Sequence, residues 1–152
     1  MTEYALRYND NKPRYDLIIL SNIYDSFSKK TQLTSEQLLA LEILRCISHF
    51  QTNLYDGSLV DAMSILTDYW DDCARVFEYG AKKYEDWNWL KGMKWSTNLA
   101  SLTRHIMAIL KDKDALIDSE SGISHFGHIL CNLVMFRYSI TKYPENNDLP
   151  TF

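Results

Sequence analysis

Two histidines and two carboxylates near residue 120 have residue types and spacing that suit a divalent metal ion. His125 and His128 are three residues apart, so their imidazoles share one face if the segment is helical. Asp118 and Glu120 come just before them in the chain. Mg²⁺ prefers oxygen ligands, whereas Mn²⁺ and heavier metals also accept imidazole nitrogens. The cluster therefore predicts a site for Mg²⁺ or Mn²⁺ with Asp118, Glu120, His125 and His128 as ligands.

The same four residues also have a purely structural interpretation. Acidic side chains before a helix stabilise the positive end of its dipole, and histidines can be hydrogen-bonded inside a core. Two histidines at this spacing are only a moderately specific signal. Both interpretations stay open at the level of the sequence.

Basic and aromatic residues supply a second candidate site, for a nucleotide. Lysine and arginine can bind phosphate oxygens, and Trp or Tyr rings can stack on a purine base. The alternative is a solvated lysine pair beside an aromatic core edge, with Arg104 ion-paired to Asp118 or Glu120. Residues of the N-terminal arm, Arg7 among them, could close over a ligand or anchor the arm by salt bridges. The candidate ligands of the nucleotide are Lys12, Arg14, Lys82, Lys83, Tyr84, Trp87, Asn88, Trp89, Lys91, Arg104 and Asn132.

Length and charge limit what kind of protein this is. A chain of 152 residues with 46% apolar content predicts a single domain, residues 1–152, with one sizeable core. A net charge of -4 argues against binding a nucleic-acid polymer but allows a small anionic ligand. The longest apolar run, Leu17 to Leu20, is too short to span a membrane, and the first residues lack the pattern of a signal peptide. We therefore expect a cytoplasmic protein that does not contact a membrane.

The cysteines and the missing motifs exclude several enzyme classes. The three cysteines are widely spaced in apolar surroundings, which predicts reduced buried thiols, with Cys131 in the core and not a nucleophile. A Ser-His-Asp order, a glycine-rich phosphate loop, a Cys-x-x-Cys pair and a His-Asp doublet are all absent from the sequence. Nucleophilic protease and P-loop chemistry are therefore disfavoured.

The elements that must position these residues are predicted to be helices. Apolar residues recur at steps of three and four, and the chain has only 5 Gly and 3 Pro. Thr34 and Gln37 form a capping box, Gly80 suits a helix C-cap, and Pro144 ends the last helix. We expect an all-α fold, a single compact bundle of about five helices behind an irregular arm, Tyr4–Tyr15. The expected helices are Asp16–Lys30, Ser35–Phe50, Ser58–Tyr79, Thr97–Lys111 and one from Ser121 or Gly122 to Tyr143.

Three strings of the sequence together resemble the phage and bacterial dATP/dGTP diphosphohydrolase N-terminal-domain family. The resemblance implies an all-helical, metal-dependent enzyme that cleaves a purine deoxynucleoside triphosphate, dGTP or dATP, to the monophosphate and pyrophosphate. It also leaves residues 18–72 as an insertion relative to shorter relatives. The strings are Arg7 to Leu17; Val76 to Tyr84 with Asn88-Trp89 and Lys91-Gly92-Met93; and Arg104-His105 with Asp118-Ser-Glu120-Ser-Gly122, His125, His128 and Asn132.

A looser similarity links His125-Phe-Gly-His128-Ile-Leu to the Glu-Leu-Gly-Asp-Val-Leu helix of MazG-like all-α pyrophosphohydrolases, in which helix carboxylates bind Mg²⁺. Here histidine replaces both acids. Many members of the closer family also carry Gly-Glu before the Asp-x-Glu pair, where this chain has Lys113-Asp114-Ala115. Either Asp114 takes the place of that glutamate, or hydrolysis is weakened or lost.

The resemblance assigns roles to the candidate residues. Asp118 and Glu120 are expected to be catalytic and to hold metal together with the histidines, and His105 is expected to orient water or a ligand. Arg104 with Lys82 or Lys83 would bind phosphate, while Trp87 or Trp89 stacks on the base. Two other functions stay open: a non-catalytic nucleotide-binding protein, for instance a phage sponge that sequesters a signalling nucleotide, and a helical assembly protein without a small ligand.

Aromatic and apolar residues also bear on the oligomeric state. The second predicted helix is strongly apolar, and four tryptophans lie elsewhere in the chain. This is more apolar surface than a monomer of this size easily hides. We therefore expect a homo-oligomer.

Overall fold

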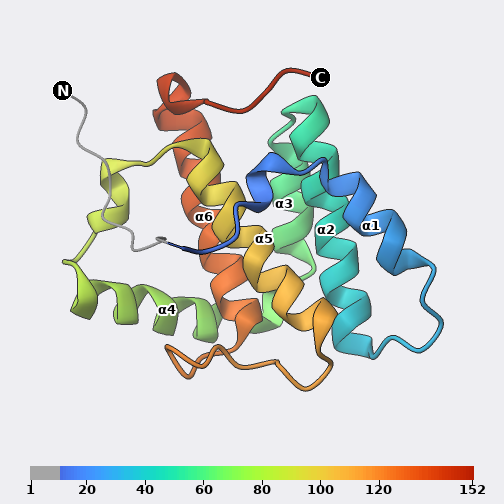
Figure 1. Cartoon of the computed structure of the whole chain (residues 1–152). Helices are drawn as coiled ribbons and strands as arrows, with labels where there is room; N and C mark the ends of the chain where they lie inside the picture. Colours follow the sequence, from blue (N-terminus) through green and yellow to red (C-terminus); the bar gives the residue numbers. More distant parts are fainter. Residues whose placement is uncertain (1–10) are drawn as a thin grey trace.

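An antiparallel pair of helices, α5 (Trp95–Lys111) and α6 (His125–Lys142), forms the centre of the fold (Figure 1). The structure is a computed structural model and describes residues 11–152. Within these residues it contains helices and no β-strand, so the prediction of an all-α fold is confirmed. The remaining α-helices are α1 (Leu20–Ser28), α2 (Ser35–Asn53), α3 (Gly57–Ser64) and α4 (Trp70–Lys83), and short 3-10 turns lie at Tyr15–Leu17, Thr67–Tyr69, Asn88–Lys91 and Pro144–Asn146.

Contacts at both ends fix the antiparallel alignment of α5 and α6. Near one end, Trp95 Nε1 of α5 donates to the carbonyl oxygen of Tyr143, 3.2 Å away, just beyond α6. Near the other end, the ring of His105 lies against those of His125 and His128. The fully buried Phe136 of α6 joins this pair to the rest of the core because its ring packs edge-on against Phe50 of α2.

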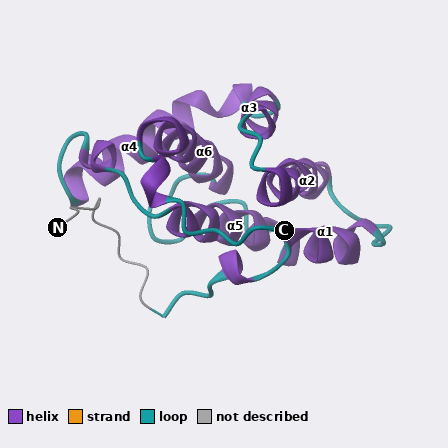
Figure 2. Cartoon of the chain, turned by 90° about the horizontal axis from the view of Figure 1, so that it is seen from above, coloured by secondary structure: helices purple, strands orange, loops and turns teal. Residues whose placement is uncertain are grey.

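Helix α2 packs against α5 and completes the core, and α1 packs against α2 (Figure 2). The predicted capping box is present. The Thr34 hydroxyl accepts a hydrogen bond from the backbone N–H of Gln37, and Oε1 of Gln37 accepts one from the backbone N–H of Thr34. Gln37 Nε2 also donates to the carbonyl oxygens of Ile109 and Leu110, both at 3.2 Å. These bonds satisfy carbonyls in the last turn of α5, so one glutamine both starts α2 and anchors it to α5.

The predicted helix Ser58–Tyr79 is wrong as a single element. The chain leaves helical geometry after Ser64 and resumes it at Trp70, which gives the separate helices α3 and α4. Helix α3 packs mainly on α2, whereas α4 packs mainly on α6, so one straight helix could not cover both surfaces. Gly80 is not a C-cap either, because α4 continues through it to Lys83.

The predicted first and last helices also start too early. Asp16 lies in a 3-10 turn, and α1 begins only at Leu20, whose N–H donates to Oε1 of Gln51. Helix α6 begins at His125 after its cap Ser124, because Gly122 has a φ of +73° and turns the chain back before the helix starts. Asp118 and Glu120 therefore lie in a turn ahead of α6.

Two further properties of the described residues match the sequence analysis. Cys46, Cys73 and Cys131 are buried free thiols, as predicted. None of the helices within residues 11–152 has the length and apolar character needed to cross a bilayer.

Helices α4 and α6 approach each other very closely at Gly127. A Cβ built on Gly127 would lie 2.7 Å from Cβ of Asp72 and 3.0 Å from its backbone carbon. No side chain fits there without moving one backbone away from the other. Gly127 therefore sets the spacing between α4 and the helix that carries His125 and His128.

We expect Gly127→Ala to lower the free energy of unfolding by about 1–3 kcal/mol because the new methyl group overpacks this crossing. Gly80→Ala is the matched control, since a Cβ at Gly80 would meet nothing within 4 Å. In a helix interior this second change should stabilise by about 0.5–1 kcal/mol. Urea unfolding of both variants checks the pair, and equal effects at the two glycines would contradict the close crossing.

Candidate functional site

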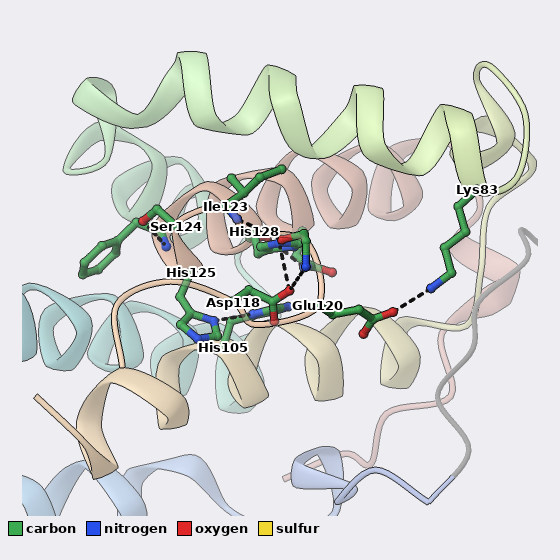
Figure 3. A network of polar contacts seen from close by, with 11 residues as sticks. Lys83, His105, Asp118, Glu120, Ile123, Ser124, His125 and His128 are labelled. Carbon is green, nitrogen blue, oxygen red and sulfur yellow. Dashed lines mark hydrogen bonds and ion pairs between the residues drawn. The ribbon is translucent and has the colours of Figure 1, made fainter. Parts of the chain in front are cut away.

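A tight turn before α6 holds Asp118 in place. The Asp118 N–H donates to the carbonyl oxygen of Ile123 at 2.8 Å, and its own carbonyl oxygen accepts from the Gly122 N–H at 2.8 Å. The Asp118 carboxylate accepts from the N–H of Ser121 at 2.9 Å. Asp118 is thus fixed through both its backbone and its side chain, with the carboxylate beside the start of α6 (Figure 3).

Three histidines from α5 and α6 meet next to this carboxylate. Nδ1 of His105 and Nδ1 of His125 are 2.9 Å apart, so one ring donates a hydrogen bond to the other. The ring of His105 also stacks on that of His128, with centroids 4.4 Å apart and an interplanar angle of 9°. Both His125 and His128 are buried. The sequence prediction that these two rings share one helix face is confirmed, and His105 joins them from the neighbouring helix.

The side chains of His105, Asp118 and His125, here named the His/Asp group, could hold a metal ion. One donor atom from each lies within 4.8 Å of the others. The set differs from the four ligands expected from the sequence, because His105 enters it while Glu120 and His128 have other contacts. Nε2 of His128 lies 2.7 Å from the hydroxyl of Ser121 and 3.7 Å from Oδ2 of Asp118. Ser121 and His128 therefore contact each other and both support the carboxylate of Asp118.

The surroundings of His125 and Asp118 shift the pKa of each side chain toward the protonation state that binds a cation. Burial lowers the pKa of His125, although the charge of Asp118 acts in the opposite direction. Burial by itself would raise the pKa of Asp118, but hydrogen bonds from Ser121 and the nearby histidines bring the pKa below its usual value. A neutral imidazole and an ionised carboxylate are the protonation states that metal ligands need.

Glu120 points away from the histidines and pairs with α4. Its Oε1 lies 2.9 Å from Nζ of Lys83, the last residue of that helix. This contact lowers the pKa of Glu120, and the charge of Lys12 acts in the same direction. The predicted alternative pairing partner, Arg104, donates instead to the carbonyl oxygen of Pro13 at 3.4 Å. The ion pair between Lys83 and Glu120 links α4 to the turn that carries Asp118 (Figure 3).

A cavity of about 770 Å³ lies between α4, α5 and α6 and opens beside these groups. Its lining includes the His/Asp group and the cationic side chains of Lys12, Lys83 and Arg104. Aromatic side chains form another part of the wall, where the ring of Trp89 packs against Phe77 and Tyr138 at 5.4 and 5.3 Å between centroids. Of the residues predicted from the sequence, the cavity is lined by Lys12, Lys83, Tyr84, Trp87, Asn88, Trp89, Arg104, His105, Asp118, Glu120, His125, His128 and Asn132.

Three predicted nucleotide ligands do not line this cavity. Arg14 pairs with Asp16 at 2.7 Å and lines a separate, smaller cavity. Lys82 and Lys91 do not line the cavity themselves, but they pair with two of its lining carboxylates, Glu78 at 3.2 Å and Glu85 at 2.6 Å. The expectation for Arg7 falls outside the described residues.

The sequence analysis missed two polar residues of the site, Ser101 and Ser121. Ser101 is buried, lines the cavity and stands four residues before His105, which puts the two on one face of α5. Ser121 braces both Asp118 and His128. An aspartate followed three residues later by serine is a signal for such a turn, so Ser121 could have been found from the sequence.

Comparison with known proteins gives one match. A family model described as dATP/dGTP diphosphohydrolase, N-terminal, matches residues 51–149, well over half of the 152 residues. The matched range contains α4, α5, α6 and the whole His/Asp group, and it begins inside the segment 18–72 for which the resemblance implies an insertion. No curated protein and no solved structure matches the chain.

We expect His125→Ala to weaken Mn²⁺ binding by more than about 100-fold, since loss of a direct ligand costs more than loss of a bracing contact. His128→Ala should weaken binding by about 10–100-fold because only the support of Asp118 is lost. His49→Ala is the control, since His49 lies on α2 and contacts Asn53, outside the cavity. Isothermal titration with Mn²⁺ measures all three. Unchanged affinity in His125→Ala would contradict the ligand set.

Proposed function

We propose, because the chain belongs to the dATP/dGTP diphosphohydrolase N-terminal family, that it hydrolyses a purine deoxynucleoside triphosphate to the monophosphate and pyrophosphate. Water adds to the α-phosphorus, the bond from that phosphorus to the bridging oxygen breaks, and pyrophosphate leaves. The observation that carries the proposal is the convergence of His105, Asp118 and His125 in a cavity that is also lined by Lys12, Lys83 and Arg104. Such a reaction needs positive charge at the phosphates and an oriented water molecule.

The donor set fits a divalent transition metal. Two imidazoles and one carboxylate suit Mn²⁺, Fe²⁺, Co²⁺ or Zn²⁺, whereas Mg²⁺ prefers a set made of oxygens. Of the two ions expected from the sequence we therefore favour Mn²⁺, held by His105, Asp118 and His125. When bound, the ion supplies charge neutralisation at the phosphates and lowers the pKa of a water molecule.

The cationic side chains of the cavity support phosphate binding. Lys12, Lys83 and Arg104 line the same cavity as the His/Asp group, from the N-terminal arm, α4 and α5. Lys83 meets Glu120 in an ion pair that is partly exposed, and such pairs contribute only about 0–1 kcal/mol. A triphosphate carries several negative charges, so it can displace Glu120 from Lys83. Glu120 would then be free to orient water beside Asp118.

The aromatic side chains support binding of the base. Trp87 lines the cavity and is 66% exposed, so its ring can stack on a ligand. Trp89 is already packed between Phe77 and Tyr138 and forms part of the wall. Asn88 and Asn132, both buried, line the same cavity and can provide hydrogen bonds to a nucleoside.

The proposal is tested by incubating the purified protein with dGTP or dATP and Mn²⁺ and following phosphorus products by ³¹P NMR. We expect equal amounts of monophosphate and pyrophosphate. Asp118→Asn should lower kcat by at least about 100-fold, because it removes the anionic ligand and keeps the side-chain shape.

Asp114→Asn is the matched control. Asp114 lies in the same connection but is exposed and does not line the cavity, so its variant should turn over as the wild type does. Loss of activity in Asp114→Asn would show that Asp114 takes the place of the missing glutamate. Recovery of intact nucleotide bound to the wild-type protein, with no pyrophosphate formed, would reject hydrolysis and favour the non-catalytic nucleotide-binding protein.

A further inference from the structure

Asn98 of α5 is a fully buried amide without a hydrogen-bond partner among the described residues. Its side chain is 0% exposed, and neither Nδ2 nor Oδ1 is paired within residues 11–152. Buried polar groups are almost always hydrogen-bonded, and an unpaired one destabilises the folded state. A ligand that pairs with such a group can offset this cost, so an unpaired amide next to a cavity is a candidate for ligand binding.

The position of Asn98 on α5 relates it to the candidate site. It precedes His105 by seven residues, two helical turns, so both side chains are on one face of the helix. That face is turned toward α6, since His105 contacts His125 and His128 there. Asn98 therefore lies along the α5–α6 contact about 10 Å from His105, at a rise of about 1.5 Å per residue.

The cavity extends in the same direction. Ser101, one turn after Asn98, lines the cavity from α5, and Met135 lines it from α6. Met135 is ten residues beyond His125, which places it about 15 Å along the helix from the metal ligands. Because the helices are antiparallel, Ser101 and Met135 both lie beyond His105 and His125 in the same direction along the cavity. Asn98 does not itself line the cavity and lies one helical turn before Ser101 on α5.

Methionines at this end allow the cavity to adapt its shape. Met93 and Met135 are buried and line it. Their unbranched side chains can change rotamer at small cost, unlike the β-branched residues that make a rigid wall. A flat ring that displaces a methionine could reach the wall behind Ser101, where the amide of Asn98 lies.

We propose that Asn98 and Ser101 form a base-recognition subsite, in which the buried amide of Asn98 binds the polar edge of the purine. The inference rests on the proposed function and adds the direction of the ligand: triphosphate at the His/Asp group and base at the methionine end. The asparagine amide presents a donor and an acceptor side by side. Guanine offers a carbonyl acceptor next to a ring N–H donor, and adenine offers an amino donor next to a ring nitrogen acceptor. Rotation of the amide matches either arrangement.

The test compares Asn98→Leu with the wild-type protein, using a dGTP analogue with a methylene bridge between the α- and β-phosphates, in the presence of Mn²⁺. Leucine keeps the branching and the number of heavy atoms of the side chain and removes the amide. We expect affinity for the analogue to fall about tenfold, the effect of one lost buried hydrogen-bonding group. Affinity for inorganic triphosphate, which has no base, should not change. The melting temperature should rise by about 2–4 °C because the unpaired amide is gone.

Ser58→Ala provides the matched control for the effect on stability. The Ser58 hydroxyl is also buried and without a partner among residues 11–152, but Ser58 lies on α3 and does not line the cavity. Its variant should be at least as stable as the wild type and bind the analogue equally well. Ser101→Ala, a smaller change that should not disturb folding, should weaken the analogue severalfold and leave inorganic triphosphate unaffected.

Three results would overturn the subsite. The first is that Asn98→Leu and Ser101→Ala both bind the analogue with wild-type affinity. The second is that these variants lose as much affinity for inorganic triphosphate as for the analogue, and the third is that the wild-type protein binds inorganic triphosphate but not the analogue. A wild-type protein that binds neither ligand would reject the proposed function itself, and the subsite with it.

Discussion

The antiparallel pairing of α5 with α6 is the interaction on which the rest of the structure depends. It brings the half-buried His105 of α5 against the buried His125 of α6, and one ring donates a hydrogen bond to the other at 2.9 Å. This arrangement requires the two helices to keep their alignment, which the bond from Trp95 to the Tyr143 carbonyl and the packing of Phe136 maintain at the opposite end. The core of the bundle and the polar group are therefore two consequences of one helix pairing.

Helix α4 forms the outer wall of the cavity and connects that pairing to ligand binding. It packs mainly on α6, held close at Gly127, and its last residue meets Glu120 of the turn. The cavity is thus bounded on one side by α5 and α6 and on the other by α4, which has an exposed ion pair at its end. In the proposed function, the nucleotide separates Lys83 from Glu120 when it binds.

Much of this could be predicted from the sequence, because local signals control it. Thr34 with Gln37 fixed the start of α2, and the spacing of His125 and His128 correctly put both rings on one face. Tertiary contacts decided the rest. The break between α3 and α4 follows from the two surfaces that the chain must cover. The group of His105 with Asp118 depends on the alignment of α5 with α6, and no spacing within one helix encodes that. Glu120 was expected beside the histidines, yet Lys83, 37 residues earlier in the chain, holds it elsewhere.

In the proposed function, His105, Asp118 and His125 bind one metal ion next to the triphosphate. Crystals of the protein grown with Mn²⁺ and a non-hydrolysable purine triphosphate, measured at the manganese absorption edge, test this. We expect one anomalous peak within coordination distance of a nitrogen from each of the two histidines and an oxygen of Asp118, with phosphate oxygens on its open side. Manganese held by carboxylates and phosphates alone, with both imidazoles still bonded to each other, would contradict it.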